Sequence, residues 1–409
     1  MRAVVANLSP ARLLFTQFMR RLGRVPYFGP LATVHESEVA PPPLPGPGWV
    51  RVRNRYGGIC GSDLHFVLGE GDFRIAPAAI PGAGFTYMGH EIVGRVSEVG
   101  PGVTSFKVGD RVAHFRGGHN CLAFGREPPC RQCATGNYNL CEAPAEELAD
   151  GSFGGGWTEE HVSPVGQLFP IPDDVSDENA LLIEPAGSAL RAVLRRTPEP
   201  GEKVLIIGQG TQGLATLQSV RALQPDCHVT VVARFPYQVE MARQFGAHEV
   251  IRVGADLYAE AARLTGGRVY RGMFGNRMLL GGFDVVYDCV GIPSTLKDAL
   301  RLARAQGTVV LVGVYLAPMQ IDLTPTWYWE VDLIGVLAHG GEDWEGERLS
   351  TFEVLARLLR EKRLNLEPFI THRFPLSRWR EAIATAVHQP RTHSIKVVFD
   401  YGDGKAPER

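Results

Sequence analysis

The fold is decided by Val204-Leu205-Ile206-Ile207-Gly208-Gln209-Gly210-Thr211-Gln212-Gly213. In this stretch an apolar run enters Gly-x-Gly-x-x-Gly, and the residues that follow continue as a helix. Glycines between a strand and a helix allow a tight turn and let a pyrophosphate approach the helix N-terminus. The sequence therefore predicts a dinucleotide site that uses Gly208, Gly210, Thr211, Gln212 and Gly213.

Two kinds of pattern surround this stretch. From about residue 184 to about residue 335, apolar strands alternate with helices, which is typical of a doubly wound parallel sheet. From about residue 48 to about residue 182, the chain is rich in Gly, Pro and short β-like runs. We interpret this earlier part as an antiparallel, barrel-like domain.

The next strand bears on the choice of cofactor. It runs from His228 to Arg234 and ends about 20 residues after the last glycine, where an NAD-binding chain usually places an acid on the ribose hydroxyls. Here Ala233 takes that place and Arg234 follows, and a guanidinium suits the 2′-phosphate of NADP. NADP is favoured over NAD, unless Arg234 lies on a solvated loop or an acid lies outside this register.

A metal-like pair precedes the glycine stretch. Cys60-Gly61-Ser62-Asp63-Leu64-His65 is followed by Gly89-His90-Glu91. A thiolate with an imidazole suits zinc, and Ser62 and His65 could move a proton from a zinc-bound alcohol. Alternatively, Cys60 is a small buried hydrophobe and His90 a core histidine, but the pair makes that reading less convincing.

A second cluster consists of Cys130, Cys133 and Cys141, in a stretch rich in Gly and Pro. Structural zinc normally takes four ligands, and the spacing points to Glu127 as the fourth. Cys121 could replace Glu127 from an adjacent loop. The alternative is a former zinc lobe that holds together without metal, although three idle thiols would be costly to keep reduced.

With these motifs in place, the chain resembles the zinc-dependent medium-chain dehydrogenases/reductases, the alcohol dehydrogenase superfamily, and most closely the polyol, threonine and glucose dehydrogenase branches. The resemblance runs from about residue 48 to about residue 400. The motifs that carry it are Gly58 to His65, Gly89-His90-Glu91, Val108 to Val112, the cysteine lobe, Glu184-Pro185, Gly208 to Gly213 and Asp288-Cys289-Val290-Gly291.

The resemblance implies a catalytic zinc on Cys60 and His90, with Glu184 as the third protein ligand. Glu91 would be a ligand or a nearby carboxylate that moves onto the metal during turnover, and Asp63 could hold a ligand in place. The implied fold is a GroES-like antiparallel β-barrel-like catalytic domain joined to a Rossmann domain. We expect the catalytic domain at 1–183 and 336–409, and the Rossmann domain at 184–335.

The implied activity is hydride transfer between a nicotinamide cofactor and an alcohol or carbonyl substrate, such as a polyol, a sugar or an amino alcohol. Zinc would lower the pKa of the alcohol, and the proton would leave through Ser62 towards His65. Two alternatives come from other classes. A zinc-independent quinone or enoyl reductase has no need for the ligand set, and a non-catalytic nucleotide-binding scaffold or redox sensor has no need for the proton route.

Length and composition agree with two globular domains. The chain has 409 residues, 44% of them hydrophobic and 21% charged, and a net charge of −2, which suggests no nucleic-acid partner. Its seven cysteines have metal-like clustering, which indicates a reducing, cytoplasmic location. No apolar run approaches the roughly 20 residues that span a bilayer. The expected partners are the small-molecule substrate and further copies of the chain in a homodimer or homotetramer.

Two segments depart from the resemblance. Residues 10–22 read as a short basic amphipathic helix, which could rest on a membrane surface or a partner, although most such helices pack on their own protein. Residues 269–280 lengthen a connection that is usually shorter. They form either an interface or cleft-edge loop, or a tolerated surface insertion.

Overall fold

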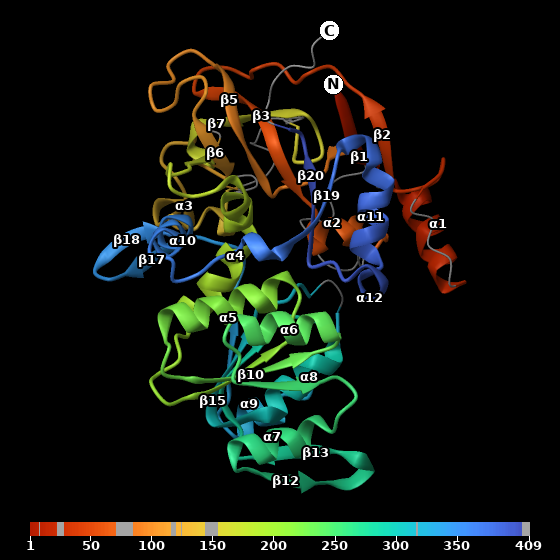
Figure 1. The fold of residues 1–409 in the computed structure, drawn as a ribbon, viewed down its shortest axis with the longest axis vertical. Coiled ribbons are helices and arrows are strands. Elements are labelled where there is room, and N and C mark those ends of the chain that lie inside the picture. The colour runs from red at the N-terminus through yellow and green to blue at the C-terminus, as the bar shows by residue number, and fades with distance from the viewer. Residues whose placement is uncertain are drawn as a thin grey trace. The chain divides into compact units, whose positions relative to one another are not determined.

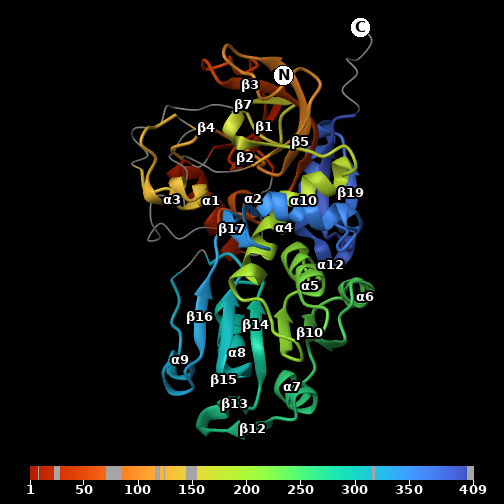
Figure 2. The ribbon, with the colours of Figure 1, turned by 90° about the vertical axis from the view of Figure 1, so that its left-hand side faces the viewer.

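The computed structural model describes residues 1–7, 9–22, 28–70, 85–115, 120–123, 125–143, 154–315 and 318–402. The chain divides into two compact units, Met1–Glu184 with Leu366–Arg409, and Pro185–Asn365. Each is drawn in Figure 1 and Figure 2 and is described here by itself. In the described part of the chain, no helix is long and apolar enough to cross a membrane.

A six-stranded parallel sheet forms the centre of the second unit, and helices lie on both of its faces (Figure 2). All neighbouring strands pair in parallel. Two strands lie on one side of β9 and three on the other, and the chain forms the side with two strands first, which is the Rossmann strand order. The order across the sheet is β11 (Glu249–Arg252), β10 (His228–Ala233), β9 (Lys203–Ile207), β14 (Phe283–Asp288), β15 (Ala303–Leu311) and β16 (Asp332–Gly335).

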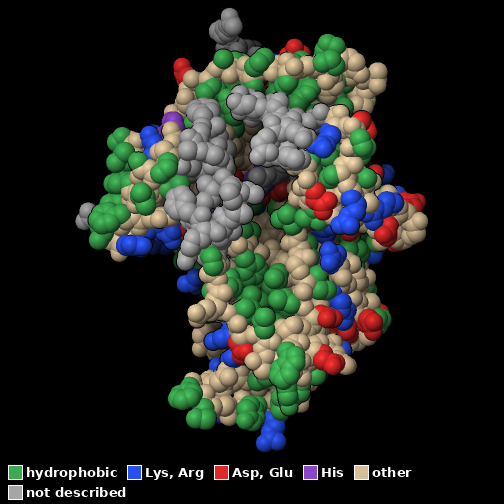
Figure 3. All heavy atoms as spheres, turned by 180° about the vertical axis from the view of Figure 1, so that it is seen from behind, with side chains coloured by type: hydrophobic (Ala, Val, Ile, Leu, Met, Phe, Trp, Pro, Cys, Tyr) green, Lys and Arg blue, Asp and Glu red, His purple; other side chains and the backbone are tan. Residues whose placement is uncertain are grey.

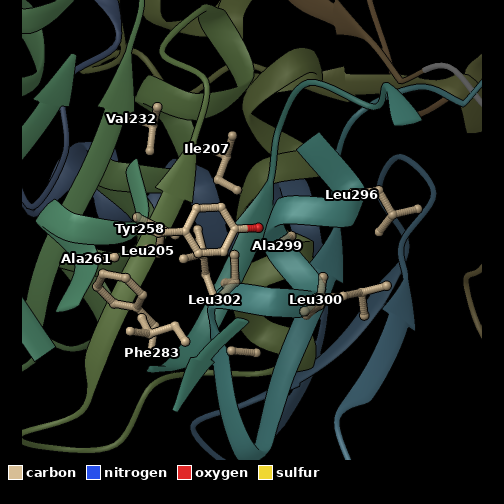
Figure 4. Close-up of a cluster of buried hydrophobic side chains, with 14 of the residues drawn as sticks. Leu205, Ile207, Val232, Tyr258, Ala261, Phe283, Leu296, Ala299, Leu300 and Leu302 are labelled. Carbon is tan, nitrogen blue, oxygen red and sulfur yellow. The ribbon is translucent and has the colours of Figure 1, made fainter. Parts of the chain in front are cut away.

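One face of this sheet packs against helices α7 and α8. Leu205 and Ile207 of β9 lie in a buried cluster with Tyr258 and Phe283 (Figure 4). The Tyr258 hydroxyl donates to Asp298 Oδ1 at 2.9 Å, so the aromatic ring is buried without an unpaired hydroxyl. The helices of this unit's sheet layers are α5 (Thr211–Leu223), α6 (Pro236–Gln244), α7 (Leu257–Thr265), α8 (Pro293–Leu302) and α9 (Thr324–Tyr328).

The lengthened connection is a hairpin of β12 (Arg268–Arg271) and β13 (Arg277–Leu280). Leu279 is buried in the same core cluster, whereas Phe274 at the turn is 99% exposed. Figure 3 shows hydrophobic side chains at the projecting end of this hairpin. The base of the insertion is thus part of the core, and its turn is a surface feature.

The first unit is built on a seven-stranded sheet. Its pairs are antiparallel, as expected, except for the parallel pair of β19 and β20. Five strands follow β19 (Ile370–Phe374) in the order β20 (Lys396–Asp400), β3 (Trp49–Gly58), β5 (Ile92–Val99), β6 (Arg111–His114) and β8 (Leu168–Pro170), and β7 (Glu160–Pro164) pairs with β3.

A smaller antiparallel sheet and several helices complete this unit. The sheet contains β2 (Val34–Glu38), β1 (Arg2–Asn7) and β4 (Phe85–Tyr87). The helices are α1 (Pro10–Arg21), α2 (Gly61–Val67), α3 (Arg131–Ala134), α11 (Trp379–Val387) and α12 (Gln389–Thr392).

The second boundary between the compact units differs in position from the expected domain bound at 336, which stays a prediction. Helix α4 (Asp177–Arg195) carries the first boundary at Glu184, but the chain returns to the first unit only at Leu366. The segment between holds β17 (Gly341–Trp344), β18 (Glu347–Ser350) and α10 (Thr351–Arg360). It belongs to the second unit, within which Glu342 forms a buried ion pair with Arg191, at 2.8 Å.

Candidate active site and metal centres

The loop after β3 places Cys60 at the start of helix α2. Asp63 Oδ2 accepts a hydrogen bond from the Cys60 amide at 2.9 Å, which ties down the first turn of the helix. The Ile59 amide donates to the Val397 carbonyl at 3.0 Å, so strand β20 fixes the same loop from its other side. Cys60 therefore has a backbone held by two separate elements.

Three candidate metal ligands meet beside this helix. The ligand atoms of Cys60, His90 and Glu91 all lie within 4.8 Å of one another. His90 Nδ1 lies 3.5 Å from Asp63 Oδ1, so Asp63 contacts the His90 imidazole as well as the Cys60 amide. A Cβ on residue 58 would lie 1.9 Å from Glu91 Oε2, so only glycine leaves room there for the Glu91 carboxylate.

Lys396 is a member of this site that the sequence analysis missed. Its ammonium donates to both Glu91 carboxylate oxygens, at 2.6 and 2.9 Å, and to the Ile59 carbonyl at 3.2 Å. Both side chains are almost completely buried. Burial by itself would lower the pKa of Lys396, but the charges of Glu91, Cys60 and Glu184 outweigh burial and raise it. Lys396 therefore stays charged and neutralises Glu91.

Glu184 is buried on α4, within reach of the Lys396 charge. Among the described residues, it does not belong to the group formed by Cys60, His90 and Glu91. Its role as the third ligand stays a prediction.

Ser62 and His65 lie on the same face of α2, three residues apart. His65 Nδ1 lies 2.6 Å from Glu70 Oε2, and Arg20 Nη2 of α1 lies 2.6 Å from Glu70 Oε1. The hydrogen bond with His65 and the Arg20 charge lower the pKa of Glu70 despite its partial burial. The Glu70 carboxylate can therefore accept a hydrogen bond from His65 when Nδ1 of its ring carries the proton.

The cysteine lobe gathers four sulfurs. The Sγ atoms of Cys121, Cys130, Cys133 and Cys141 all lie within 4.8 Å of one another. The Cys121–Cys141 and Cys130–Cys141 distances are 3.8 and 3.9 Å. Tetrahedral zinc with bonds of about 2.3 Å would separate its sulfurs by about 3.8 Å. The four thiols therefore fit a structural zinc.

Backbone amides support this arrangement. The Cys130 amide donates to Cys121 Sγ at 3.4 Å, and the Glu142 amide donates to Cys130 Sγ at 3.5 Å. Amide hydrogen bonds from Cys133 and Glu142 lower the pKa of Cys130 to about 6, whereas burial raises the pKa of Cys133 and of Cys141. A metal that binds all four would displace the remaining protons.

Glu127 does not lie where the spacing placed it. It is exposed and lies outside the sulfur group, and the fourth position is taken by Cys121, the substitute that the sequence left open. The spacing placed a ligand three residues before Cys130. The loop instead folds back, and Cys121 is 99% buried beside the other thiols.

The glycine loop has the conformation that its sequence predicts. Gly208 has φ +94°, and a Cβ on residue 213 would lie 1.8 Å from the Gly208 carbonyl oxygen. Gln212 Nε2 donates to the Pro185 carbonyl at 2.9 Å. The side-chain amide of Gln209 is buried, and neither of its polar atoms has a hydrogen-bond partner among the residues that the structure describes. The residue before α5 (Thr211–Leu223) is Gly210, which has no side chain to cap the helix N-terminus and therefore suits a bound phosphate.

Arg234 follows β10 directly and is exposed. Gln238 Oε1 accepts hydrogen bonds from the Arg234 and Phe235 amides, at 3.1 and 3.2 Å, which fixes the backbone at this turn. The guanidinium lies 5.2 Å from the centre of the Phe235 ring, and none of the described carboxylates forms an ion pair with it. It is therefore available to an anionic ligand.

Comparison with known proteins defines the class. The alcohol dehydrogenase GroES-like domain profile matches residues 46–173, and the zinc-binding dehydrogenase profile matches residues 213–352. L-idonate 5-dehydrogenase of Vitis vinifera is 31% identical over 363 residues, which cover 88% of this chain and 89% of the relative. The chain belongs to the zinc-dependent medium-chain alcohol dehydrogenase family.

Solved structures of dehydrogenases have the same fold as this chain. An alcohol dehydrogenase from Escherichia coli CFT073 in complex with NADH superposes with a TM-score of 0.71 and 25% identity, over 98% of this chain and 99% of the other. A zinc-binding dehydrogenase from Sinorhizobium meliloti 1021 bound to NADP gives 0.71 and 26%, over 90% and 96%. The expected fold class is confirmed, as is the expected class of enzyme, a zinc-dependent oxidoreductase that acts on CH–OH groups with a nicotinamide cofactor.

Proposed function

We propose that this enzyme transfers hydride between NADP and a secondary hydroxyl group of a polyol or sugar acid. The observation that carries the proposal is the meeting of Cys60, His90 and Glu91 beside the helix that bears Ser62 and His65. The name of the L-idonate relative supports the substrate class. Several neighbouring hydroxyls would distinguish such substrates from simple alcohols.

Cys60, His90 and Glu184 would hold the catalytic zinc, which supplies Lewis-acid chemistry to the substrate oxygen. Lys396 would orient the Glu91 carboxylate beside this centre, since its ammonium donates to both carboxylate oxygens. Asp63 would orient Cys60 and His90, because its two oxygens face one backbone amide and one imidazole. Glu91 would therefore bind the metal only when its ion pair with Lys396 breaks.

The proton of the substrate hydroxyl would leave through Ser62 Oγ to His65, and from there to solvent, since the His65 side chain is 33% exposed. The glycine loop would bind the pyrophosphate through Gly208, Gly210, Thr211, Gln212 and Gly213. Arg234 would pair with the 2′-phosphate of NADP, for which an unpaired, exposed guanidinium is suited.

Cys121, Cys130, Cys133 and Cys141 would bind a second, structural zinc. The seven cysteines are free thiols, which favours a reducing compartment such as the cytoplasm. A homodimer or homotetramer is the proposed assembly, and the partly exposed Leu333 on the edge strand β16 is consistent with further pairing there. Size-exclusion chromatography with light scattering tests the assembly.

The decisive experiment is a panel of polyols, sugar acids, amino alcohols and simple alcohols, assayed with NADP and NAD by nicotinamide absorbance. Turnover of polyols with NADP supports the proposal, and zinc analysis tests the metal. Arg234→Ala should weaken NADP binding about tenfold or more with little effect on NAD. Equal losses for both cofactors would show that Arg234 does not contact the 2′-phosphate.

A further inference from the structure

The helix α1, which departs from the family pattern, packs against the C-terminal end of the catalytic helix α2. Leu13 of α1 and Val67 of α2 lie in one buried cluster. A Cβ on residue 69 would lie 3.0 Å from Thr16 Cγ2, so the two elements are in close contact. The expectation that this helix packs on its own protein agrees with these contacts.

Polar side chains of α1 reach the last carbonyls of α2. The carbonyl groups at the end of a helix have no donor within the helix. Gln17 Nε2 lies 3.4 Å from the Gly69 carbonyl oxygen, and Arg20 Nη1 lies 3.5 Å from that of Leu68. These are long hydrogen bonds, so they orient α2 more than they stabilise it.

The short contacts run through Glu70. One carboxylate oxygen lies 2.6 Å from Arg20 Nη2, and the other lies 2.6 Å from His65 Nδ1. The Glu70 amide also donates to the His65 carbonyl at 2.7 Å, so the two residues are held together by backbone as well. A continuous chain of contacts therefore links α1 to the imidazole.

We propose that Arg20 is a positioning residue for proton transfer: it clamps Glu70, and Glu70 holds His65 as the tautomer with its proton on Nδ1. The inference rests on the proposed function of Ser62 and His65. With Nδ1–H donated to Glu70, Nε2 keeps its lone pair. The substrate proton then passes through Ser62 Oγ to Nε2 and on to solvent. The Nδ1 proton stays in place throughout, and no electrons move in this step.

The opposite side of α1 carries exposed Leu14, Phe18 and Leu22, which are spaced by four residues. The ion pair of Arg20 with Glu70 is partly exposed, with 37% and 27% of the two side chains accessible. Its loss should therefore shift Tm by no more than about 3 °C.

Arg20→Met is the test variant, and Arg21→Met is the matched control. Arg21 is a neighbour on the same helix, is exposed, and forms no ion pair with a described residue. The zinc-loaded full chain, with ¹⁵N in its histidine rings, is studied by NMR at a pH of about 9, where histidine is neutral. The His65 signal is assigned with His65→Ala.

We expect a protonated Nδ1 in the wild type and in Arg21→Met, and a mixture of tautomers in Arg20→Met. Glu70→Gln should also give a mixture, because a neutral amide is a weaker acceptor. A His65 spectrum that is the same in Arg20→Met and the wild type would overturn the proposal.

Turnover provides a second measurement. Arg20→Met should lower kcat about three- to tenfold with little change in KM, because it disturbs a proton transfer and not substrate binding. In a His65→Ala background the same change should have no further effect. An equal loss in both backgrounds would overturn the proposal. If His65→Ala alone keeps full turnover, the proposed proton route fails, and the NMR measurement still decides whether Arg20 fixes the tautomer.

Discussion

The two metal-binding clusters are assembled in opposite ways. The cysteine lobe takes all its thiols from the segment between Cys121 and Cys141 and is held mainly by its own sulfurs and amides. The catalytic cluster combines Cys60 and His90 with Lys396 from the far end of the chain. A bound metal would therefore fix the shape of the lobe, whereas the protein itself prearranges the catalytic cluster.

The largest contrast should come from removing one thiolate from each cluster. Cys60→Ala should lower kcat/KM by at least about 10³-fold and remove one zinc, because the chemistry loses its Lewis acid. Cys133→Ser should remove the other zinc and lower Tm, while the folded protein keeps most of its turnover. Zinc per chain and kcat/KM, measured on the same samples, check this. A Cys60→Ala protein with normal zinc and normal turnover would refute the assignment.

Substitution of Lys396 tests whether the protein itself prearranges the catalytic cluster. Lys396→Met leaves Glu91 buried and unpaired, which should cost about 3 kcal/mol or more of unfolding free energy. The loss should be smaller in zinc-loaded protein, because the cation replaces part of the missing charge. Adding Glu91→Gln to Lys396→Met should restore stability, and Glu91→Gln alone serves as the control. Urea unfolding measures all four proteins, and a double variant no more stable than Lys396→Met would contradict this account.

Cys121 and Glu127 are the two candidates for the fourth ligand of the cysteine lobe, and substitutions distinguish between them. Cys121→Ser should lose the structural zinc and about 2–3 kcal/mol of stability, the effect expected when a ligand present at about 100 times its Kd no longer binds. Glu127→Gln should retain two zinc ions and the wild-type Tm, because the carboxylate is exposed and away from the sulfurs. Loss of zinc in Glu127→Gln, with zinc kept in Cys121→Ser, would restore the ligand set that the spacing suggested.

The smallest effect concerns a buried histidine that is no candidate ligand. His161 Nδ1 pairs with Asn54 Oδ1 at 2.8 Å, and its ring lies against that of His114. Burial, and then the charge of His114, lower the pKa of His161 well below its usual value. Below about pH 6.5 the unfolded chain binds the proton first, so the folded state loses stability as pH falls.

The variant that tests this is His161→Gln, which removes the titrating ring. The difference in unfolding free energy between wild type and variant should narrow as the pH drops from about 7.5 to about 5.5. Urea unfolding at several pH values measures this difference. A difference that stays constant, or grows in acid, would show that His161 binds its proton in the folded state.

Local sequence was sufficient where geometry is set by neighbouring residues. Gly208 and Gly213 are required by a positive φ and by a close backbone contact, both of which a strand–turn–helix pattern implies. The pairing of Cys60 with His90 followed from ligand chemistry and from family resemblance. For the glycines, the physical cause lies within a few residues of the motif.

Sequence was insufficient where distant segments meet. Lys396 could have been noticed as a cation within the apolar strand Ile395 to Phe399, because a charge in a fully buried strand needs a partner. Its partner Glu91 is 305 residues away and could not be identified by spacing. The buried ion pair of Arg191 with Glu342 likewise joins segments that are distant in the sequence, and no local pattern indicates it.

The place of β20 in the sheet has a consequence for biosynthesis. The ribosome makes the dinucleotide-binding unit, residues 185–365, in one piece, and that unit can fold as soon as it emerges. The catalytic unit has to wait for Lys396, because until then Glu91 has no counter-charge and the Ile59 loop has no strand beside it. We therefore expect nascent chains to acquire the cofactor fold first, and the catalytic unit to stay accessible to chaperones until Lys396 has been synthesised.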